Sequence, residues 1–428
     1  MMKAYPEYIE SREKWIGDIP KDWIETRFKF LFSQKGKIGN IDLPCGSISF
    51  GNVVYKDSEK LTEETRLAYQ EVLNGEFLVN PLNLNYDLKS LRTALSDKDV
   101  IVSSGYIVLK SNEDTVSEYL KWLLFVFDIR HMKTLGAGIR QTITAKDIGD
   151  CYTYLPSLSE QKSIAQFLDF ETTRIDNLIY EKQNFIKLLQ EKREALISHV
   201  VTKGLNPNVD MKDSGVKWIG EIPEHWEVKT IKYLGQLNPN KSELKVKFLE
   251  GTCSFVPMAK LKTDSLLLDE VKQVSEVFDG YTYFKNEDVL FAKVTPCFEN
   301  KNMCIAKDLD SGIGFGSSEI NVFRVNKKTD NRYFYYLIQE NQFMQFAKSN
   351  MTGAGGLKRV PSEVILDYKI AIPSIEEQRE IADYLEFKFQ KLNELTNETN
   401  NSIELLKEHR SALISAAVTG KIDLREES

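Results

Sequence analysis

The chain has few cysteines, few histidines and no long apolar run, and each shortage excludes a class of protein. The five cysteines among 428 residues are odd in number and never spaced Cys-x-x-Cys, which excludes a disulfide framework or zinc knuckle and predicts reduced thiols. The four histidines lack metal-ligand spacing. No stretch approaches the roughly 18 apolar residues of a membrane span, and the N-terminus lacks a secretory apolar run, so we expect a cytoplasmic protein.

Neither sign of charge dominates the chain. The balance of 56 Lys and Arg against 63 Asp and Glu gives a net charge of −7, which for the whole chain argues against a nucleic-acid binder. However, residues 374–428 carry a net charge of −5, whereas residues 21–155 carry −1 and residues 217–372 carry +1. The acidity therefore describes the C-terminal segment, and the two near-neutral segments remain compatible with DNA contact.

The sequence also lacks the patterns of catalysis. The glycine-rich segment GIGFGSS at 312–318 has neither the order of a phosphate-binding loop nor that of a dinucleotide fingerprint. The carboxylate pairs Glu63-Glu64 and Glu376-Glu377 are adjacent in sequence and would point apart on a helix. We therefore predict no catalytic site, no metal site and no cofactor bound by this chain.

What the chain does contain is a second copy of itself. KWIGDIP at 14–20 recurs as KWIGEIP at 217–223, an offset of 203 residues. LPSLSEQ at 155–161 recurs as IPSIEEQ at 372–378, an offset of 217, and the same offset relates Gly136-Ala137-Gly138 to Gly353-Ala354-Gly355. Four blocks in the same order indicate an internal repeat of two units. The segments between the blocks share little sequence, which indicates either two different binding functions or drift after duplication.

Each unit ends in a segment that predicts one long helix. Residues 157–203 and 374–419 contain neither Gly nor Pro, and each segment opens with a capping-box pattern, Ser157 with Glu160 and Ser374 with Glu377. About 45 helical residues span roughly 65–70 Å, which is too long for an unpartnered globular helix.

A heptad pattern with the same register in both segments predicts that these helices pair as a coiled coil. Lys182, Glu171 and Thr399 interrupt the pattern. Periodicity leaves open whether the helices pair with each other or with another chain; we favour an antiparallel pair within the chain. The predicted seam consists of Ile164, Leu168, Ile175, Leu178, Phe185, Leu189 and Leu196 in the first helix, and Ile381, Leu385, Leu392, Leu395, Leu406 and Leu413 in the second.

Candidate DNA contacts are long polar side chains near the glycine-rich loops, where the backbone can approach a duplex. The alternative for any one of them is a solvated surface charge. The candidates are Arg140, Gln141 and Thr142 after the first loop, Lys358 and Arg359 after the second, and Lys89, Arg92, Lys293 and Lys301 elsewhere in the variable segments.

The ordered set KWIG(D/E)IPxxW, variable segment, TGAG or its equivalent, (L/I)PSxxEQxxIAxxL and a long helix ending in ALISxxVT, written twice, resembles the specificity subunit of type I restriction–modification systems. The resemblance covers nearly the whole chain. It implies an α+β fold in which two mixed α/β target recognition domains are separated by two long antiparallel coiled-coil helices, with a pseudo-twofold internal repeat.

The expected domains are a first recognition domain at 1–156, a first spacer helix at 157–203, a linker at 204–216, a second recognition domain at 217–373, a second helix at 374–421 and a tail at 422–428. The resemblance implies a non-catalytic subunit that reads one asymmetric, bipartite sequence in double-stranded DNA. The implied partners are two methyltransferase subunits, which bind S-adenosylmethionine, and restriction subunits, which use ATP and Mg²⁺. For docking we look to the exposed helix faces and to the blocks of Trp15 and Trp218, unless these tryptophans are local core anchors. The alternative is a coiled-coil adaptor that bridges proteins without reading DNA.

Overall fold

The computed structural model describes residues 3–57, 61–82, 91–135, 142–244, 250–354 and 356–425. The chain divides into two compact units: unit 1 comprises Met1–Lys182 and Asn401–Ser428, and unit 2 comprises Gln183–Asn400. Each unit therefore contains a globular part together with a portion of both long helices, and the two units are described separately.

The centre of unit 1 is an antiparallel sheet of four strands in the order β4 (Phe32–Gln34), β11 (Ile107–Ser111), β8 (Phe77–Val79) and β9 (Thr93–Leu95). Along β8 the side chains alternate, because Phe77 and Val79 enter the core that contains helix α2 (Ser117–Arg130), whereas Leu78 enters a second core on the opposite face. The sheet is thus buried on both faces, which explains its continuous apolar strands.

Short elements complete unit 1. The strands that the apolar runs at 100–102 and 106–109 predicted are confirmed as β10 and β11. Two-stranded antiparallel pairs are formed by β1 (Tyr8–Glu10) with β2 (Asp18–Pro20), β3 (Ile24–Arg27) with β12 (Tyr152–Leu155), β5 (Gly46–Ser49) with β6 (Asn52–Tyr55), and β7 (Gln70–Val72) with β10 (Val100–Val102); the short helices are η1 (Phe28–Phe30), α1 (Glu63–Leu67), η2 (Met132–Thr134) and α3 (Ala145–Asp150).

Unit 2 repeats this plan and adds to it. Its first sheet has the order β16 (Gly235–Leu237), β25 (Ile320–Val325), β22 (Val289–Ala292) and β23 (Met303–Ile305), and helices α6 (Asn331–Leu337) and α7 (Asn341–Ser349) contribute to the core on one face. A second sheet follows the order β20 (Val271–Gln273), β17 (Thr252–Val256), β24 (Ile313–Gly316) and β21 (Thr282–Lys285), with β17 and β24 parallel.

The glycine-rich segment at 312–318 forms strand β24 of this second sheet. A Cβ atom added at Gly314 would lie 2.3 Å from the Phe284 ring, so the glycine is required by close packing. Small elements of unit 2 are β13 (Met211–Asp213) with β14 (Glu221–Pro223), β15 (Glu227–Thr230) with β28 (Lys369–Ile372), β18 (Leu261–Lys262) with β19 (Ser265–Leu266), β26 (Thr352–Ala354) with β27 (Leu357–Arg359), and the helices η3 (Ile231–Tyr233), η4 (Lys241–Glu243), α5 (Val274–Val277), η6 (Met258–Lys260), η7 (Asp310–Gly312) and α8 (Ser362–Leu366).

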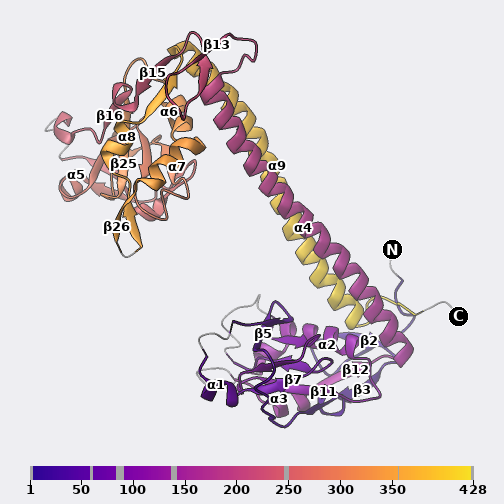
Figure 1. Cartoon of the computed structure of the whole chain (residues 1–428). Coiled ribbons are helices and arrows are strands. Elements are labelled where there is room, and N and C mark those ends of the chain that lie inside the picture. The colour runs from indigo at the N-terminus through magenta and orange to yellow at the C-terminus, as the bar shows by residue number, and fades with distance from the viewer. Residues whose placement is uncertain are drawn as a thin grey trace. The chain divides into compact units, whose positions relative to one another are not determined.

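The two long helices are α4 (Leu158–Lys203) and α9 (Ile375–Val418), each starting one residue after the start expected from the sequence. In unit 1, Ile164 and Leu168 of α4 share a core with Leu413 of α9. Figure 1 shows the yellow end of α9 beside the magenta first part of α4 in this unit. In unit 2, Leu189 of α4 shares a core with Leu385 of α9.

Within each unit the two helices run in opposite directions. In unit 1 the Arg410 guanidinium lies 2.9 Å from Asp176, and Gly420, just after the end of α9, packs on Trp23, whose indole bonds to Glu160 at the start of α4. In unit 2 the Arg193 guanidinium lies 4.0 Å from the centre of the Phe389 ring. Contacts near the end of one helix are therefore made with the start of the other.

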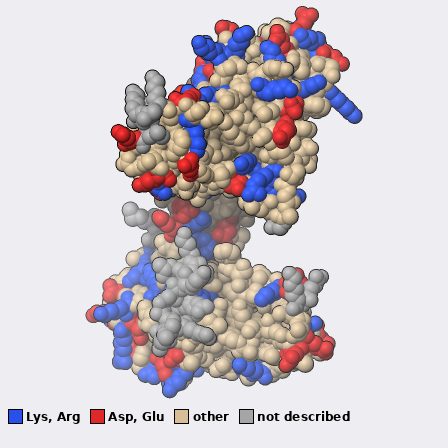
Figure 2. Space-filling model, turned by 90° about the vertical axis from the view of Figure 1, so that its left-hand side faces the viewer, with Lys and Arg blue, Asp and Glu red and all other residues tan. Residues whose placement is uncertain are grey.

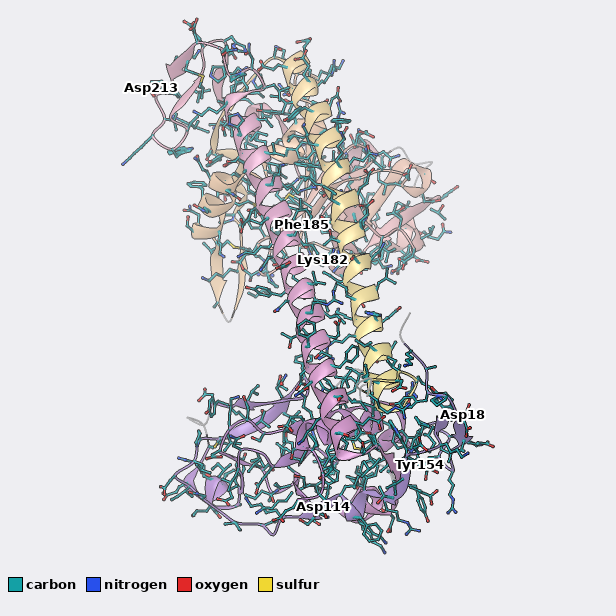
Figure 3. All side chains as sticks on the ribbon, turned by 90° about the vertical axis from the view of Figure 1, so that its right-hand side faces the viewer. Asp18, Asp114, Tyr154, Lys182, Phe185 and Asp213 are labelled. Carbon is teal, nitrogen blue, oxygen red and sulfur yellow. The ribbon has the colours of Figure 1, made fainter. Side chains whose placement is uncertain are left out.

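The predicted seam is buried at the outer parts of the helices and exposed in the middle. Ile164, Leu168, Ile175, Leu189, Ile381, Leu385, Leu392 and Leu413 are buried, Leu196 and Leu406 are half-buried, and Leu178, Phe185 and Leu395 are exposed. Figure 3 labels Phe185 beside Lys182, one of the polar residues that interrupt the heptad pattern of α4. The globular parts of each unit bury the ends of the seam, whereas Leu178, Phe185 and Leu395 keep at least 36% of their surface exposed.

Candidate nucleic-acid interface

A projecting hairpin carries the best-presented basic residues of unit 2. Strands β26 and β27 pair antiparallel with Gly353 opposite Lys358, and every described residue of the hairpin from Thr352 to Arg359 is exposed. Figure 1 shows the hairpin extending from the body of the unit. The glycine-rich loop predicted at 353–356 is thus the turn of a hairpin that displays Lys358 and Arg359.

The hairpin is fixed at its base by the loop that follows β22. The Thr295 backbone N–H donates to the Lys358 carbonyl at 3.0 Å, and the Lys358 N–H donates to the Thr295 hydroxyl at 2.9 Å. The Thr295 hydroxyl donates in turn to the Gly356 carbonyl at 2.9 Å. Three hydrogen bonds to one threonine hold the hairpin in position, and sequence reasoning gave no indication of Thr295.

Arg359 has an acidic partner in the same unit. Its guanidinium donates to both carboxylate oxygens of Glu319, at 3.1 and 2.6 Å, and this hydrogen bonding lowers the pKa of Glu319. Because the pair is partly exposed, exchange of Glu319 for a phosphate costs little. Lys293 is half-buried beside the hairpin, where its carbonyl accepts the N–H of Val360 at 2.9 Å.

Two other sequence candidates have packing roles. The side chain of Arg92 is buried and donates to the Leu82 carbonyl at 2.5 Å, while its backbone N–H donates to Asp128 at 2.5 Å. Lys301 lies 2.9 Å from Glu194 of α4 and therefore ties the globular part of unit 2 to the helix. We accordingly place both residues in the framework of their units and correct their selection as DNA contacts.

The first glycine-rich loop contributes one described candidate. Thr142 is exposed in unit 1. Lys89, Arg140 and Gln141 lie outside the described residues. On the face that Figure 2 shows, Lys and Arg side chains are interspersed with Asp and Glu side chains. DNA contact on this face would therefore depend on individual projecting side chains and not on one continuous basic surface.

The duplicated (L/I)PSxxEQ motif proves to be the framework that joins each helix to its unit. The Ser157 hydroxyl accepts the Glu160 N–H at 3.3 Å, as a helix cap does, but the Glu160 carboxylate accepts from the indole of Trp23 at 3.1 Å. The same arrangement recurs with Ser374, Glu377 and Trp226, at 3.3 and 3.1 Å. The expected capping box is thus only half formed, because the carboxylate binds a tryptophan.

The glutamine of the motif also has the same role twice. The Gln161 amide donates to the Pro156 carbonyl at 3.0 Å, and its oxygen accepts the Val116 N–H at the start of α2 at 3.1 Å. Gln378 donates to Pro373 at 3.0 Å and accepts from Asp330 at the start of α6 at 2.9 Å. These residues position each long helix against a second helix of its unit, which explains why the motif occurs in both units.

The tryptophans of the KWIG blocks differ between the units. Trp15 is buried and stacks on His131 with ring centres 5.8 Å apart, so it is a core anchor of unit 1. Trp218 is 45% exposed and stacks on Phe346 and Tyr368. The docking role considered for these blocks is therefore compatible with Trp218 and not with Trp15.

The described residues offer little for chemistry. No group of three or more His, Cys, Asp or Glu within them is arranged to hold a metal ion. Each of the five cysteines is a free thiol, and burial raises the pKa of Cys151 and Cys253 to about 11. Among the helices in the described ranges, none combines the length and the apolar character needed to cross a bilayer.

The sequence profile of the family described as Type I restriction modification DNA specificity domain matches residues 80–187 and 223–405. The chain belongs to this family. The two matched stretches correspond to the two copies of the internal repeat, so the family domain occurs twice.

Several characterised proteins are similar to this specificity-domain protein. The Type I restriction enzyme EcoEI specificity subunit of Escherichia coli is 37% identical over 164 residues, which are 38% of this chain and 27% of that protein. The match therefore spans about a quarter of that relative's length. The Type I restriction enzyme MjaVIII specificity subunit of Methanocaldococcus jannaschii is 25% identical over 421 residues, covering 95% of this chain and 94% of that protein.

Solved structures show the same fold at low sequence identity. A chain from a study of complex assembly and conformational transition of the type I R-M system has a TM-score of 0.67 at 14% identity, covering 94% of this chain and 99% of that chain. The HsdS subunit from Thermoanaerobacter tengcongensis has a TM-score of 0.51 at 15% identity, covering 96% and 100%. The expected α+β class with two specificity domains is thereby confirmed.

Proposed function

We propose that this chain is the non-catalytic DNA-reading subunit of a type I restriction–modification complex that acts in the cytoplasm. The regions at 1–156 and 217–373 each read one half of an asymmetric bipartite target. The helices at 157–203 and 374–421 form an antiparallel coiled coil with pseudo-twofold symmetry, which sets the spacing between the half-sites. Residues 204–216 act as linker and 422–428 as tail.

One observation carries this proposal: the two units share a framework down to individual hydrogen bonds but differ in the surfaces that project from it. The Ser-Glu-Trp and Gln arrangements recur in both units. The hairpin β26–β27 belongs to unit 2 and the hairpin β5–β6 to unit 1, and only unit 2 has the sheet containing β17 and β24 among the described residues. A common framework with different projections suits two readers of different sequences.

Exposed apolar residues on the helices support docking of a partner present in two copies. In unit 1, Phe170 of α4 is 68% exposed and Leu405 of α9 is 66% exposed. In unit 2, Leu188 of α4 is 60% exposed and Phe387 of α9 is 55% exposed. Phe387 and Leu405 follow Phe170 and Leu188 at the repeat offset of 217, so each unit presents one phenylalanine and one leucine. Such repeated apolar exposure is typical of protein contact sites.

The expected partners are two methyltransferase subunits, which would supply S-adenosylmethionine, and restriction subunits, which would supply ATP and Mg²⁺ chemistry. Exchange of residues 217–372 for the equivalent segment of another specificity subunit tests the proposal. We expect the methylated sequence of the assembled complex to change in one half-site. A change in both halves or in neither would contradict the two-reader arrangement.

The competing function is an adaptor that bridges proteins without reading DNA. Salt-dependent and sequence-selective duplex binding by the assembled methyltransferase complex separates the two functions, because an adaptor would bind cognate and scrambled duplexes equally. Methylation by this chain with no partner added would instead show that it has an active site of its own.

A further inference from the structure

The β5–β6 hairpin of unit 1 has an unusual turn. Ser49 pairs with Asn52, so the connection consists of Phe50 and Gly51 alone, with φ of +47° and +77°. Two successive residues with positive φ define the type I′ turn, whose first position favours Asn, Asp or Gly. A phenylalanine there is a backbone outlier, because a bulky L-residue rarely adopts a left-handed conformation.

Burial does not compensate for this strain. The Phe50 side chain is 84% exposed, the largest exposure among the large apolar side chains of the described residues. The turn itself is anchored, because a Cβ atom added at Gly51 would lie 2.8 Å from the Leu91 side chain and the Asn52 amide donates to the Phe50 carbonyl at 3.3 Å. The hairpin therefore holds a strained aromatic ring out into solvent, which neither propensity nor packing explains.

The surroundings of the ring fit DNA. Tyr55, at the other end of β6, is 62% exposed, and the Lys98 ammonium lies 5.9 Å from the centre of its ring. Exposed aromatic rings with a nearby cation are the means by which proteins stack on bases and contact phosphates. The hairpin also lies in the part of unit 1 that the internal repeat does not preserve, as expected of a residue that reads one half-site only.

We propose that Phe50 is a wedge that inserts between two base pairs of the half-site read by unit 1. Apolar side chains that enter a base step unstack it and kink the duplex. This deformation costs least at pyrimidine–purine steps, so the half-site of unit 1 contains such a step, selected by its deformability. The inference rests on the proposed function and assigns a residue to one of its two readers.

The test uses the complete chain assembled with its methyltransferase partner and duplexes that carry 2-aminopurine at successive steps of the methylated half-sites. We expect fluorescence to rise on binding at one step of the unit 1 half-site, because the base becomes unstacked. Phe50→Asn removes the rise and weakens binding to the cognate duplex by about tenfold or more. Phe30→Asn is the matched control, since Phe30 is 63% exposed in the same unit and belongs to the framework helix η1.

Phe50→Asn also separates function from folding. Asn suits the first position of a type I′ turn, so the variant is expected to raise the melting temperature of unit 1 by about 2–4 °C while DNA binding weakens. A wild-type fluorescence signal and affinity in Phe50→Asn, or an equal loss in Phe30→Asn, would overturn the wedge. If the wild-type complex showed no sequence-selective binding, the proposed function itself would fail, which is a different result.

Discussion

Substitution of Glu160 by alanine should release the junction between α4 and unit 1. Glu160 is 7% exposed, and its carboxylate accepts from the indole of Trp23 at 3.1 Å and from the hydroxyl of Tyr5. Burial and the bond to Glu160 raise the pKa of Tyr5, so its hydroxyl stays protonated as a donor. Alanine would leave two buried donors without an acceptor.

The expected magnitude follows from these contacts. An orphaned buried donor costs roughly 1–3 kcal/mol, so Glu160→Ala should destabilise unit 1 by about 3 kcal/mol once relief from burying the carboxylate is subtracted. Glu377→Ala in unit 2 should cost about 1–2 kcal/mol, because Trp226 is buried whereas the His225 side chain is 53% exposed and can turn to water. The unit 1 variant is therefore the more damaging of the two.

Peptide-resolved hydrogen exchange under native conditions is the appropriate assay, because a chain of two units has no single unfolding free energy. Protection should fall in the first turns of α4 and in β1–β2 for Glu160→Ala, and at the start of α9 for Glu377→Ala. Glu376→Ala, at an exposed neighbouring position, is the control and should change stability by less than about 0.5 kcal/mol. If Glu160→Ala matched this control, or if unit 2 lost more than unit 1, the tryptophan–glutamate contact would not be what holds the junction.

Three further predictions concern other parts of the chain. Burial raises the pKa of Asp128 to about 6, so the folded state binds its proton more tightly than the unfolded state and unit 1 loses stability as the pH rises from about 4 through 6. Asp128→Asn should therefore stabilise unit 1 by about 2–3 kcal/mol at pH 8 and have little effect at pH 4; a constant difference in melting across this range would argue against the assignment. Leu168→Ala, at a fully buried seam position, should cost about 3 kcal/mol in urea unfolding, whereas Leu178→Ala, 36% exposed, should cost less than about 1.5 kcal/mol; equal losses would contradict the observed burial. Lys358→Ala and Arg359→Ala should each lower the slope of log affinity against log salt by about 0.9 if they contact phosphates, and unchanged slopes in fluorescence anisotropy would remove the hairpin from the interface.

The sequence predicted the long helices well because their signals are local. Absence of Gly and Pro, a serine cap and apolar periodicity act within a few residues, and the helices begin within one residue of the expected starts. The seam could be predicted only in part. Heptad position shows which side of a helix faces its partner, but the exposure of Leu178 and Leu395 depends on whether other elements cover the pair.

The candidate DNA contacts were less accessible to sequence reasoning. Arg92 and Lys301 have long side chains whose ends reach partners distant in the sequence, such as Glu194 for Lys301. Lys358 and Arg359 were found because a glycine-rich loop recurs, which is a pattern in the chain. Phe50 was missed, although a bulky residue before Gly51 between two strand-like runs was the available signal.

The sequence by itself determined the repeat, the family and the places where long helices begin, because these depend on the order of residues and on interactions within a few positions. Only the tertiary structure decided that Glu160 and Glu377 accept from tryptophans, that Arg92 is buried, and that Phe50 is held out at a strained turn. The reason is physical: a polar or aromatic side chain takes its role from the partners within a few ångströms of it, and those partners come from segments that only folding brings together.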